Sequence, residues 1–538
     1  MNMKKLIYST LLVVLFFGIP ACTKDFLELE PQTGLMEDNF YKTENDAFLA
    51  MTAVYDALSV QNWQYVPIMS DIFSDDAFGG GADAGDMRQW HEIEQNVLTP
   101  ENSAAEALWS RCYSGIYRAN LYLQKQDGIA WTNEANKKQM EGEVRFLRAY
   151  FYWDLVRHYG SVPVLTAMLP NTEDYKTVPQ DAPEVAFKQV ANDLLFAIEN
   201  CKTTTTASEK GRATKYAAEA LLARVYMFYT DFAKPVWGLT GELTNGTVTV
   251  DANYVRTALN DIITNGGFTL VPNYADIFSY TNENNSESIF EWQYSEKAKS
   301  DDWGGWGING NFSVVFYGPR NPKGASPHAE VEGWSFSTIT WSAYNEFEAG
   351  DPRRDASIFN ANTELTSYTK AFQNTGYFNR KYMGVKAFEG TAGSTPHNWR
   401  INYKDIRYAE VLLMAAEMNL TTDAVKALNY LNQVRTRAMG TGAALTVIDK
   451  AAIIHESRVE FVGEGHRKWD LLRMGLDYTE TKVKESFDAT TVPAVVPNPD
   501  DFTMRAFNKN NWGLFPIPGK EIRNMNAGLL KQYAPAYK

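Results

Sequence analysis

The segment from Glu456 to Gly475, ESRVEFVGEGHRKWDLLRMG, restricts the possible folds of this chain more than any other stretch. Apolar residues in and just before its first half follow the three-to-four spacing of a helix face. Gly463 and Gly465 predict the end of that helix, at a point that needs a left-handed or closely approached backbone. A second short amphipathic segment, with Trp469 on its apolar side, runs to Gly475. We expect two helices joined by a tight glycine corner, with charges that set packing register rather than perform chemistry.

Helical periodicity also covers most of the sequence before residue 265 and after residue 400. The pattern predicts helices at 45–58, 101–126, 134–159, 182–200, 214–230, 253–264, 403–420, 423–438 and 448–463. Alanine opposite large aromatic side chains in these ranges is what close antiparallel helix packing needs. The sequence therefore predicts a mainly α fold of helix pairs, similar to a tetratricopeptide scaffold, although it shows no strict repeat.

Two stretches lack this periodicity and predict a loop-rich, partly β layer over the helices. Residues 61–100 are rich in glycine and aspartate, and residues 265–400 combine glycine, asparagine and serine with scattered aromatic residues. A short strand is expected near 289–294. We therefore expect a single domain at 45–538, with a helical scaffold at 45–264 and 401–538 and the binding layer at about 61–100 and 265–400.

Residues 1–22 are typical of an exported bacterial lipoprotein. Lys4 and Lys5 precede an apolar run that is too short for a comfortable membrane span, and the run ends directly before Cys22. We expect a signal peptide at 1–21, lipidation of Cys22, and an anchor with a polar tether at 22–44. Pro20 departs from the usual lipoprotein motif, so an ordinary signal peptide is the alternative.

Charge, cysteine and histidine content argue against several functional classes. The chain carries 51 Lys and Arg against 65 Asp and Glu, a net charge of −14, and shows no basic patch, so no nucleic-acid partner is expected. Cys112 and Cys201 each fall in a helical pattern and are expected as two packed thiols, although an exported protein permits a disulfide. No zinc-binding spacing is present, and we expect neither a metal nor another cofactor.

The sharpest functional signal is Trp303-Gly-Gly-Trp306 within the aromatic-rich stretch. Two glycines between two tryptophans disrupt helix and strand periodicity, so we expect the indoles on an irregular surface segment. An exposed flat ring can stack on the C–H face of a pyranose while nearby polar groups bind the hydroxyls. By analogy with base stacking, one such contact contributes roughly 1–3 kcal/mol. Packing of both rings against the core is the structural alternative.

Further candidates for sugar contacts come from both loop-rich stretches. Trp334 follows Gly333, and Asp75 and Asp76 lie in an acidic loop whose spacing does not fit a calcium-binding motif. The predicted ligand-binding residues are Trp303, Trp306, Trp334, Trp90, Arg88, Asp75 and Asp76. The charged turn Asp351-Pro-Arg-Arg354 is interpreted as structural.

Together with three further motifs, the segment 456–475 resembles the signature of the SusD/RagB family of outer-membrane nutrient-binding lipoproteins. The motifs follow in the family's order: RYAEVLLMAAE at 407–417, LNYLNQVRTRA at 428–438, and LFPIPGKE at 514–521 before Asn526. The N-terminal stretch from Cys22 through FLELEP is similar too. The resemblance spans nearly the whole chain and is most specific in its last third.

This resemblance implies a lipid-anchored, cell-surface protein of the outer membrane. It would capture an oligosaccharide or polysaccharide, through aromatic residues of two loop regions, for a SusC-like TonB-dependent transporter. Catalysis is not expected, because the sequence has neither a phosphate loop nor a Gly-x-Ser-x-Gly elbow. A peptide ligand, a glycoside hydrolase built on two of the many carboxylates, and a purely structural transporter partner are the alternatives.

Overall fold

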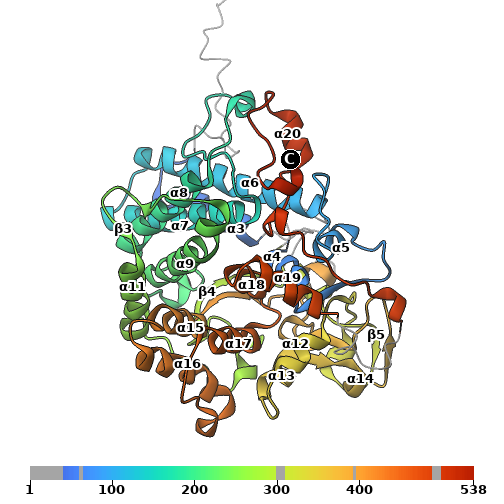
Figure 1. Ribbon diagram of the computed structural model, residues 1–538. Coiled ribbons are helices and arrows are strands. Elements are labelled where there is room, and N and C mark those ends of the chain that lie inside the picture. The colour runs from blue at the N-terminus through green and yellow to red at the C-terminus, as the bar shows by residue number, and fades with distance from the viewer. Residues whose placement is uncertain (1–39, 60–64, 298–308, 392–394, 488–497) are drawn as a thin grey trace, which may run out of the picture.

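The computed structural model describes residues 40–59, 65–297, 309–391, 395–487 and 498–538. Its scaffold is an array of helices, each packed against the next, that runs down the left side of Figure 1. These helices are α3 (Glu44–Ser59), α6 (Ser103–Lys125), α7 (Glu134–Tyr159), α8 (Pro183–Asn200), α9 (Lys215–Phe228), α11 (Ala252–Asn265), α15 (Tyr408–Asn419) and α16 (Ala424–Met439). The prediction of a mainly α fold with a helix-pair scaffold is confirmed.

Helix α7 is the centre of this array, in contact with α3, α6 and α8. The Asn133 side chain caps its first turn by accepting a hydrogen bond from the Asn136 backbone N–H at 2.8 Å. Every residue from Phe146 to Tyr159 is buried, as expected for a helix surrounded by other elements. The helix stops at Gly160, whose φ of +74° suits a residue without Cβ.

The glycine corner has the predicted form. Helix α17 (Lys450–Phe461) ends before Gly463 and Gly465, each with φ of +78°, and α18 (Arg467–Arg473) follows. A Cβ added to Gly465 would lie 2.6 Å from the Cα of Pro67, so the corner also needs glycine for close approach. Helix α19 (Leu476–Glu485) continues the chain.

Buried ion pairs hold this corner in place, as predicted. Glu460 lies between three arginines: Arg353 at 3.2 Å, Arg407 at 3.0 Å and Arg437 at 2.5 Å. Burial alone would raise the pKa of Glu460, but the three guanidinium groups hold it well below its usual range. Arg353 also binds Asp351 at 2.8 Å, so the turn at 351–354 is structural.

The predicted helix at 403–420 begins late. Its first residues form strand β10 (Tyr403–Arg407), which pairs antiparallel with β4 (Ser288–Trp292). All five residues of β10 are buried, although Lys404, Asp405 and Arg407 are charged, so the sequence has no apolar pattern that marks this segment as a core strand. The expected strand near 289–294 is confirmed as β4.

The stretch 61–100 is more regular than predicted. It contains α4 (Val66–Phe73), β1 (Ala77–Gly80) and α5 (Arg88–Glu94). All eight residues of α4 are buried, so the helix has no amphipathic pattern to reveal it. Strand β1 pairs antiparallel with β6 (Phe336–Ile339), which joins the two stretches that we assigned to the binding layer.

Short elements make up the rest of the layer and the C-terminal region, and several appear at the lower right of Figure 1. They are α10 (Lys234–Trp237), α12 (Trp341–Glu346), α13 (Pro352–Ser357), α14 (Ala361–Glu364), α20 (Gly519–Asn524), β2 (Leu243–Thr244), β3 (Thr249–Val250), β5 (Arg320–Lys323), β7 (Ile358–Asn360), β8 (Ser367–Thr369) and β9 (Tyr377–Asn379). The antiparallel pairs are β2 with β3, β5 with β8, and β7 with β9. Cys112 and Cys201 are buried free thiols, as expected. Among the helices of the described ranges, none has the length and apolarity of a membrane span.

Candidate functional site

Trp334 is the candidate ring that the structure places at the surface. It precedes β6 and is partly buried, with its ring standing edge-on to Phe312 and Phe316 at centroid distances of 5.8 Å. The backbone N–H of Trp334 donates to the Val315 carbonyl at 2.8 Å. A Cβ on Gly333 would lie 2.1 Å from the Tyr317 carbonyl oxygen, so glycine allows this close approach. The indole is therefore held on an aromatic base while part of it stays accessible.

Trp303 and Trp306 lie outside the described residues, but both ends of their segment are described. The Ser295 N–H donates to the Asn309 carbonyl at 2.7 Å, and the Asn311 N–H donates to the Trp399 carbonyl at 2.7 Å. Phe312, three residues after Asn309, contacts the Trp334 ring. Asn309, the first described residue after the two predicted tryptophans, is therefore three positions from a ring that contacts Trp334.

Polar side chains lie close to this aromatic base. Arg320 binds Asp86 at 3.1 Å, and both side chains are partly exposed. The Arg320 backbone N–H donates to the Ser335 hydroxyl at 3.1 Å, which places Arg320 next to Trp334 in space. Arg320 was not predicted as a site residue, because an arginine fourteen positions before a tryptophan has no local signature. Its guanidinium group can donate to sugar hydroxyls or to a carboxylate.

Arg88 begins α5 and is freely accessible, with a side chain that is 82% exposed and 3.4 Å from Glu92. Trp90 on the same helix is not. Its ring is 0% exposed and packs edge-on to Phe316 at 4.9 Å and Phe336 at 5.3 Å. The expectation of an accessible Trp90 is wrong, because α5 packs this ring against Phe316, one of the two rings that contact Trp334.

Asp75 and Asp76 are also buried, so the prediction that they bind sugar is wrong. Arg467 donates to Asp75 at 2.7 Å, and Arg458 donates to Asp76 at 2.8 Å. Burial would raise the pKa of Asp75, but these two arginines hold it well below its usual range. The pair ties the segment after α4 to the glycine corner and has a structural role.

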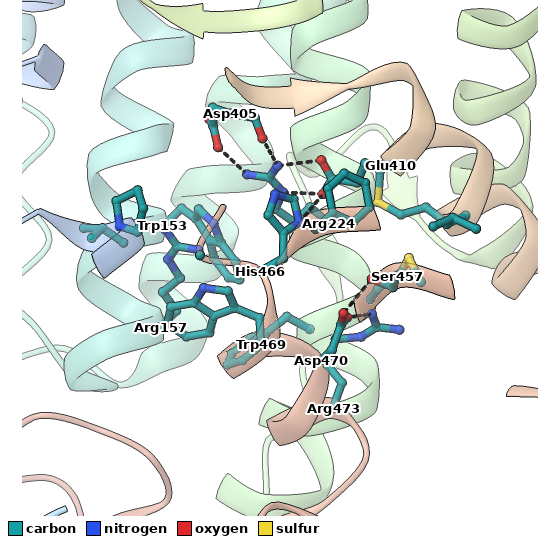
Figure 2. A pocket seen from close by; sticks show the side chains of 18 of the residues that line it. Trp153, Arg157, Arg224, Asp405, Glu410, Ser457, His466, Trp469, Asp470 and Arg473 are labelled. Carbon is teal, nitrogen blue, oxygen red and sulfur yellow. Dashed lines mark hydrogen bonds and ion pairs between the residues drawn. The ribbon is translucent and has the colours of Figure 1, made fainter. Parts of the chain in front are cut away.

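A charged cavity of about 80 Å³ lies inside the scaffold between α7, α9, α15, α17 and α18. Figure 2 shows Arg224 pointing at Asp405 and Glu410, with hydrogen bonds of 2.9 and 2.8 Å. Asp470 accepts from the Ser457 hydroxyl at 2.7 Å. Burial lowers the pKa of His466 well below its usual range, which keeps this imidazole neutral.

The charges of this cavity therefore bind one another. A space of this size holds a few water molecules and is far smaller than a site for an oligosaccharide. We assign it to the internal packing of the scaffold and retain the surface around Trp334 as the candidate site.

Comparisons with protein families cover both halves of the chain. Residues 330–537 match the family described as SusD family, and residues 25–227 match the family described as starch-binding associating with outer membrane. SusD-like protein P25 of Formosa agariphila is 27% identical over 509 residues, covering 86% of this chain and 89% of the relative. A SusD-like protein of Bacteroides ovatus is 28% identical over 498 residues, covering 88% of this chain and 82% of the relative.

Solved structures share the fold. A laminarin binding SusD-like protein has a TM-score of 0.75 and 27% identity, with 90% of this chain and 98% of that one covered. Surface glycan-binding protein A from Bacteroides thetaiotaomicron in complex with laminarihexaose has a TM-score of 0.76 and 27% identity, with 91% and 99% covered. The surface glycan-binding protein A from Bacteroides fluxus has a TM-score of 0.77 and 27% identity, with 92% and 100% covered.

Proposed function

Since the chain belongs to the SusD/RagB family, we propose that it captures an oligosaccharide at the outer membrane and passes it to a TonB-dependent transporter of the SusC type. The observation that carries this proposal is the similarity over 90% or more of the chain to proteins named for laminarin binding or solved with laminarihexaose. Recognition is then the function, and the protein breaks no bond. We extend the proposal to cell-surface exposure through a lipid on Cys22.

The proposed glycan site is the surface around Trp334. Its half-buried indole offers a flat apolar face that the rings of Phe312 and Phe316 hold in place. Trp303 and Trp306 belong to the proposal through their sequence pattern and the position of their segment's described ends. Arg320, Asp86 and the exposed Arg88 supply donors and acceptors for hydroxyl groups.

This division of roles suits capture rather than catalysis. Stacking on an aromatic ring contributes roughly 1–3 kcal/mol, so a few rings bind a glycan with modest affinity. Anchoring such a site beside a transporter raises the effective concentration of the glycan at the pore. Weak single-site binding is therefore compatible with efficient delivery.

The experiment is calorimetric titration of a soluble form of the chain beginning at Thr23 against a polysaccharide panel that includes laminarin and laminarihexaose. A Trp303→Ala/Trp306→Ala variant is titrated in parallel, with Phe48→Ala as a matched control, because Phe48 is an exposed aromatic residue on α3. We expect selective binding that the double variant loses and the control keeps, with unchanged thermal melting. The absence of binding to every glycan would overturn the proposal, and a peptide ligand or a structural role would replace it. Release of new reducing ends from the polysaccharide would show that the protein is an enzyme.

The transporter partner is tested by co-purification of the full-length, anchored protein from outer membranes. We expect a TonB-dependent barrel to accompany it and to be lost when Cys22→Ser removes the proposed lipid. A protein that stays anchored but purifies without any barrel would contradict the delivery role while leaving the glycan site intact.

A further inference from the structure

A groove of about 920 Å³ runs along one face of α6, and Trp334 does not line it. Trp109, Tyr113 and Tyr117 lie four residues apart on this face, so their rings follow one another at about 6 Å intervals along the helix. The opposite wall comes from residues 163–178 and from the C-terminal region around α20, which Figure 1 places beside α6 at the top of the molecule.

Hydrogen bonds hold the groove open. The Tyr113 hydroxyl donates to the Pro163 carbonyl at 2.8 Å, and the Asn120 amide donates to the Leu165 carbonyl at 2.9 Å. Both bonds tie the wall to α6, so the groove exists without any occupant. Its surface is mostly apolar, and Tyr117 is 55% exposed. Covering this surface removes apolar area from water, which favours an apolar occupant.

The start of the described chain lies at one end of this groove. The Lys42 carbonyl accepts a hydrogen bond from the Ala130 N–H at 2.9 Å, and Thr43 pairs with Ala130. Ala130 follows Lys125, a lining residue of the groove, by five positions. Residues 22–39 therefore join the body of the protein where α6 and the groove end.

The sequence of this preceding segment fits the groove. Residues 25–31 read DFLELEP, and Pro31 favours an extended conformation at Glu30. In an extended chain Leu27 and Leu29 share one face, and Phe26, Glu28 and Glu30 share the other. The first face suits the apolar floor of the groove, and the acidic face suits Lys125 at its rim.

Length and homology agree with this arrangement. Pro31 and Phe40 are nine positions apart, and an extended chain of this length spans up to about 30 Å. The groove follows α6 from Lys125 back to Trp109 for about 24 Å. The family match of the N-terminal half begins at residue 25, so these residues belong to the unit that the relatives share.

We propose that residues 25–31 bind in the α6 groove of their own chain. Cys22 then lies three residues from the bound segment, within about 10 Å of the groove. If Cys22 carries a lipid, as the proposed function requires, the groove side of the protein faces the membrane at a short and fixed distance. The interaction itself needs no lipid and no glycan, so its test is independent of the proposed function.

Disulfide trapping tests the position of the segment in a soluble chain beginning at Thr23. Leu27→Cys is combined in turn with Leu121→Cys, Met168→Cys or Met525→Cys, which line different parts of the groove. The control combines Leu27→Cys with Val425→Cys on α16, where the native side chain is 72% exposed. The native thiols do not interfere, because Cys112 and Cys201 are buried and burial raises the pKa of both.

We expect at least one groove pair to form its disulfide at least 10-fold faster than the control pair, as measured by peptide mapping without reduction. Equal rates for all three groove pairs and the control would overturn the proposal. A second readout is hydrogen exchange of residues 163–178 in the unsubstituted chain and in the variant Leu27→Ser/Leu29→Ser.

We expect exchange in this wall to be at least 10-fold faster in the serine variant, with exchange in α16 unchanged. Equal exchange in both chains would contradict binding of the segment. Protection of the groove by laminarihexaose in the unsubstituted chain would also overturn it, because the groove would then be open to a glycan.

Discussion

Arg458 on α17 donates a hydrogen bond to Asp76 at 2.8 Å, although 382 positions separate the two residues in the sequence. Arg467 makes the equivalent contact with Asp75 at 2.7 Å. All four side chains are buried. These ion pairs join the region after α4 to the glycine corner. They therefore connect an early and a late segment of the chain through one buried charged cluster.

Arg467→Leu removes one of two cations that face the buried Asp75 carboxylate. We expect the free energy of unfolding to fall by about 3–5 kcal/mol, because a buried charge loses much of its compensation. Urea denaturation measures the change. Arg88→Leu is the control, since that side chain is 82% exposed, and it should change stability by less than about 0.5 kcal/mol. Equal effects of the two substitutions would refute a structural role for the Asp75 pair.

Gly465→Ala combines two penalties. The residue has φ of +78°, and the added Cβ would meet the Pro67 backbone at 2.6 Å. We expect a loss of about 2–4 kcal/mol of unfolding free energy from strain and overpacking. Gly442→Ala is the matched control, because its Cβ would meet nothing within 4 Å and its φ is not positive. That substitution should be neutral or stabilise by up to about 1 kcal/mol, and a comparable loss there would contradict the steric argument.

His455 on α17 gives the stability a dependence on pH. Its Nδ1 lies 2.6 Å from Glu346, and its Nε2 lies 3.5 Å from Glu348. The hydrogen bond to Glu346 raises the pKa of His455 above its ordinary value, and burial opposes this only in part. A raised pKa in the folded state means that the stabilisation is complete below the unfolded pKa of about 6.5 and is lost as pH rises through the folded value.

The stability difference between the unsubstituted chain and His455→Gln should therefore be larger at pH 6 than at pH 9. Urea denaturation across this range measures it. Val447→Gln, at a side chain that is 78% exposed, should show a constant difference. A difference for His455→Gln that stays constant or grows with pH would contradict the assignment.

Trp334→Ala removes the accessible ring of the proposed glycan site. We expect glycan affinity to fall between about 5- and 150-fold, which corresponds to roughly 1–3 kcal/mol of stacking. Trp334→Phe keeps a flat ring on the same aromatic base and should retain most of the affinity. Calorimetric titration measures binding, and thermal melting confirms that both variants fold. If the alanine and phenylalanine variants bind equally well, the ring does not contact the glycan.

Most helices of the scaffold could be predicted from the sequence, because the residue patterns that specify them are local. The helix at 134–159 has the predicted bounds, since an asparagine cap and a terminal glycine act within one turn of the chain. The glycine corner was predictable for the same reason, because a left-handed backbone restricts the residue itself. The family motifs of the last third also depend on residue type and spacing alone.

The candidate site could be predicted only in part, because the burial of a loop residue depends on partners that are distant in the sequence. Trp90 and Trp334 look alike in the sequence, as tryptophans near glycine or charge, but Phe316 and Phe336 cover the first and leave the second partly exposed. The local sequence of Asp75 and Asp76 is that of a loop, and it does not show that Arg458 and Arg467, near the other end of the chain, pair with them in the interior. The sequence by itself determined the helices, the corner and the kind of residues available for binding. The tertiary structure decided which of them reach solvent, because exposure depends on contacts between residues hundreds of positions apart.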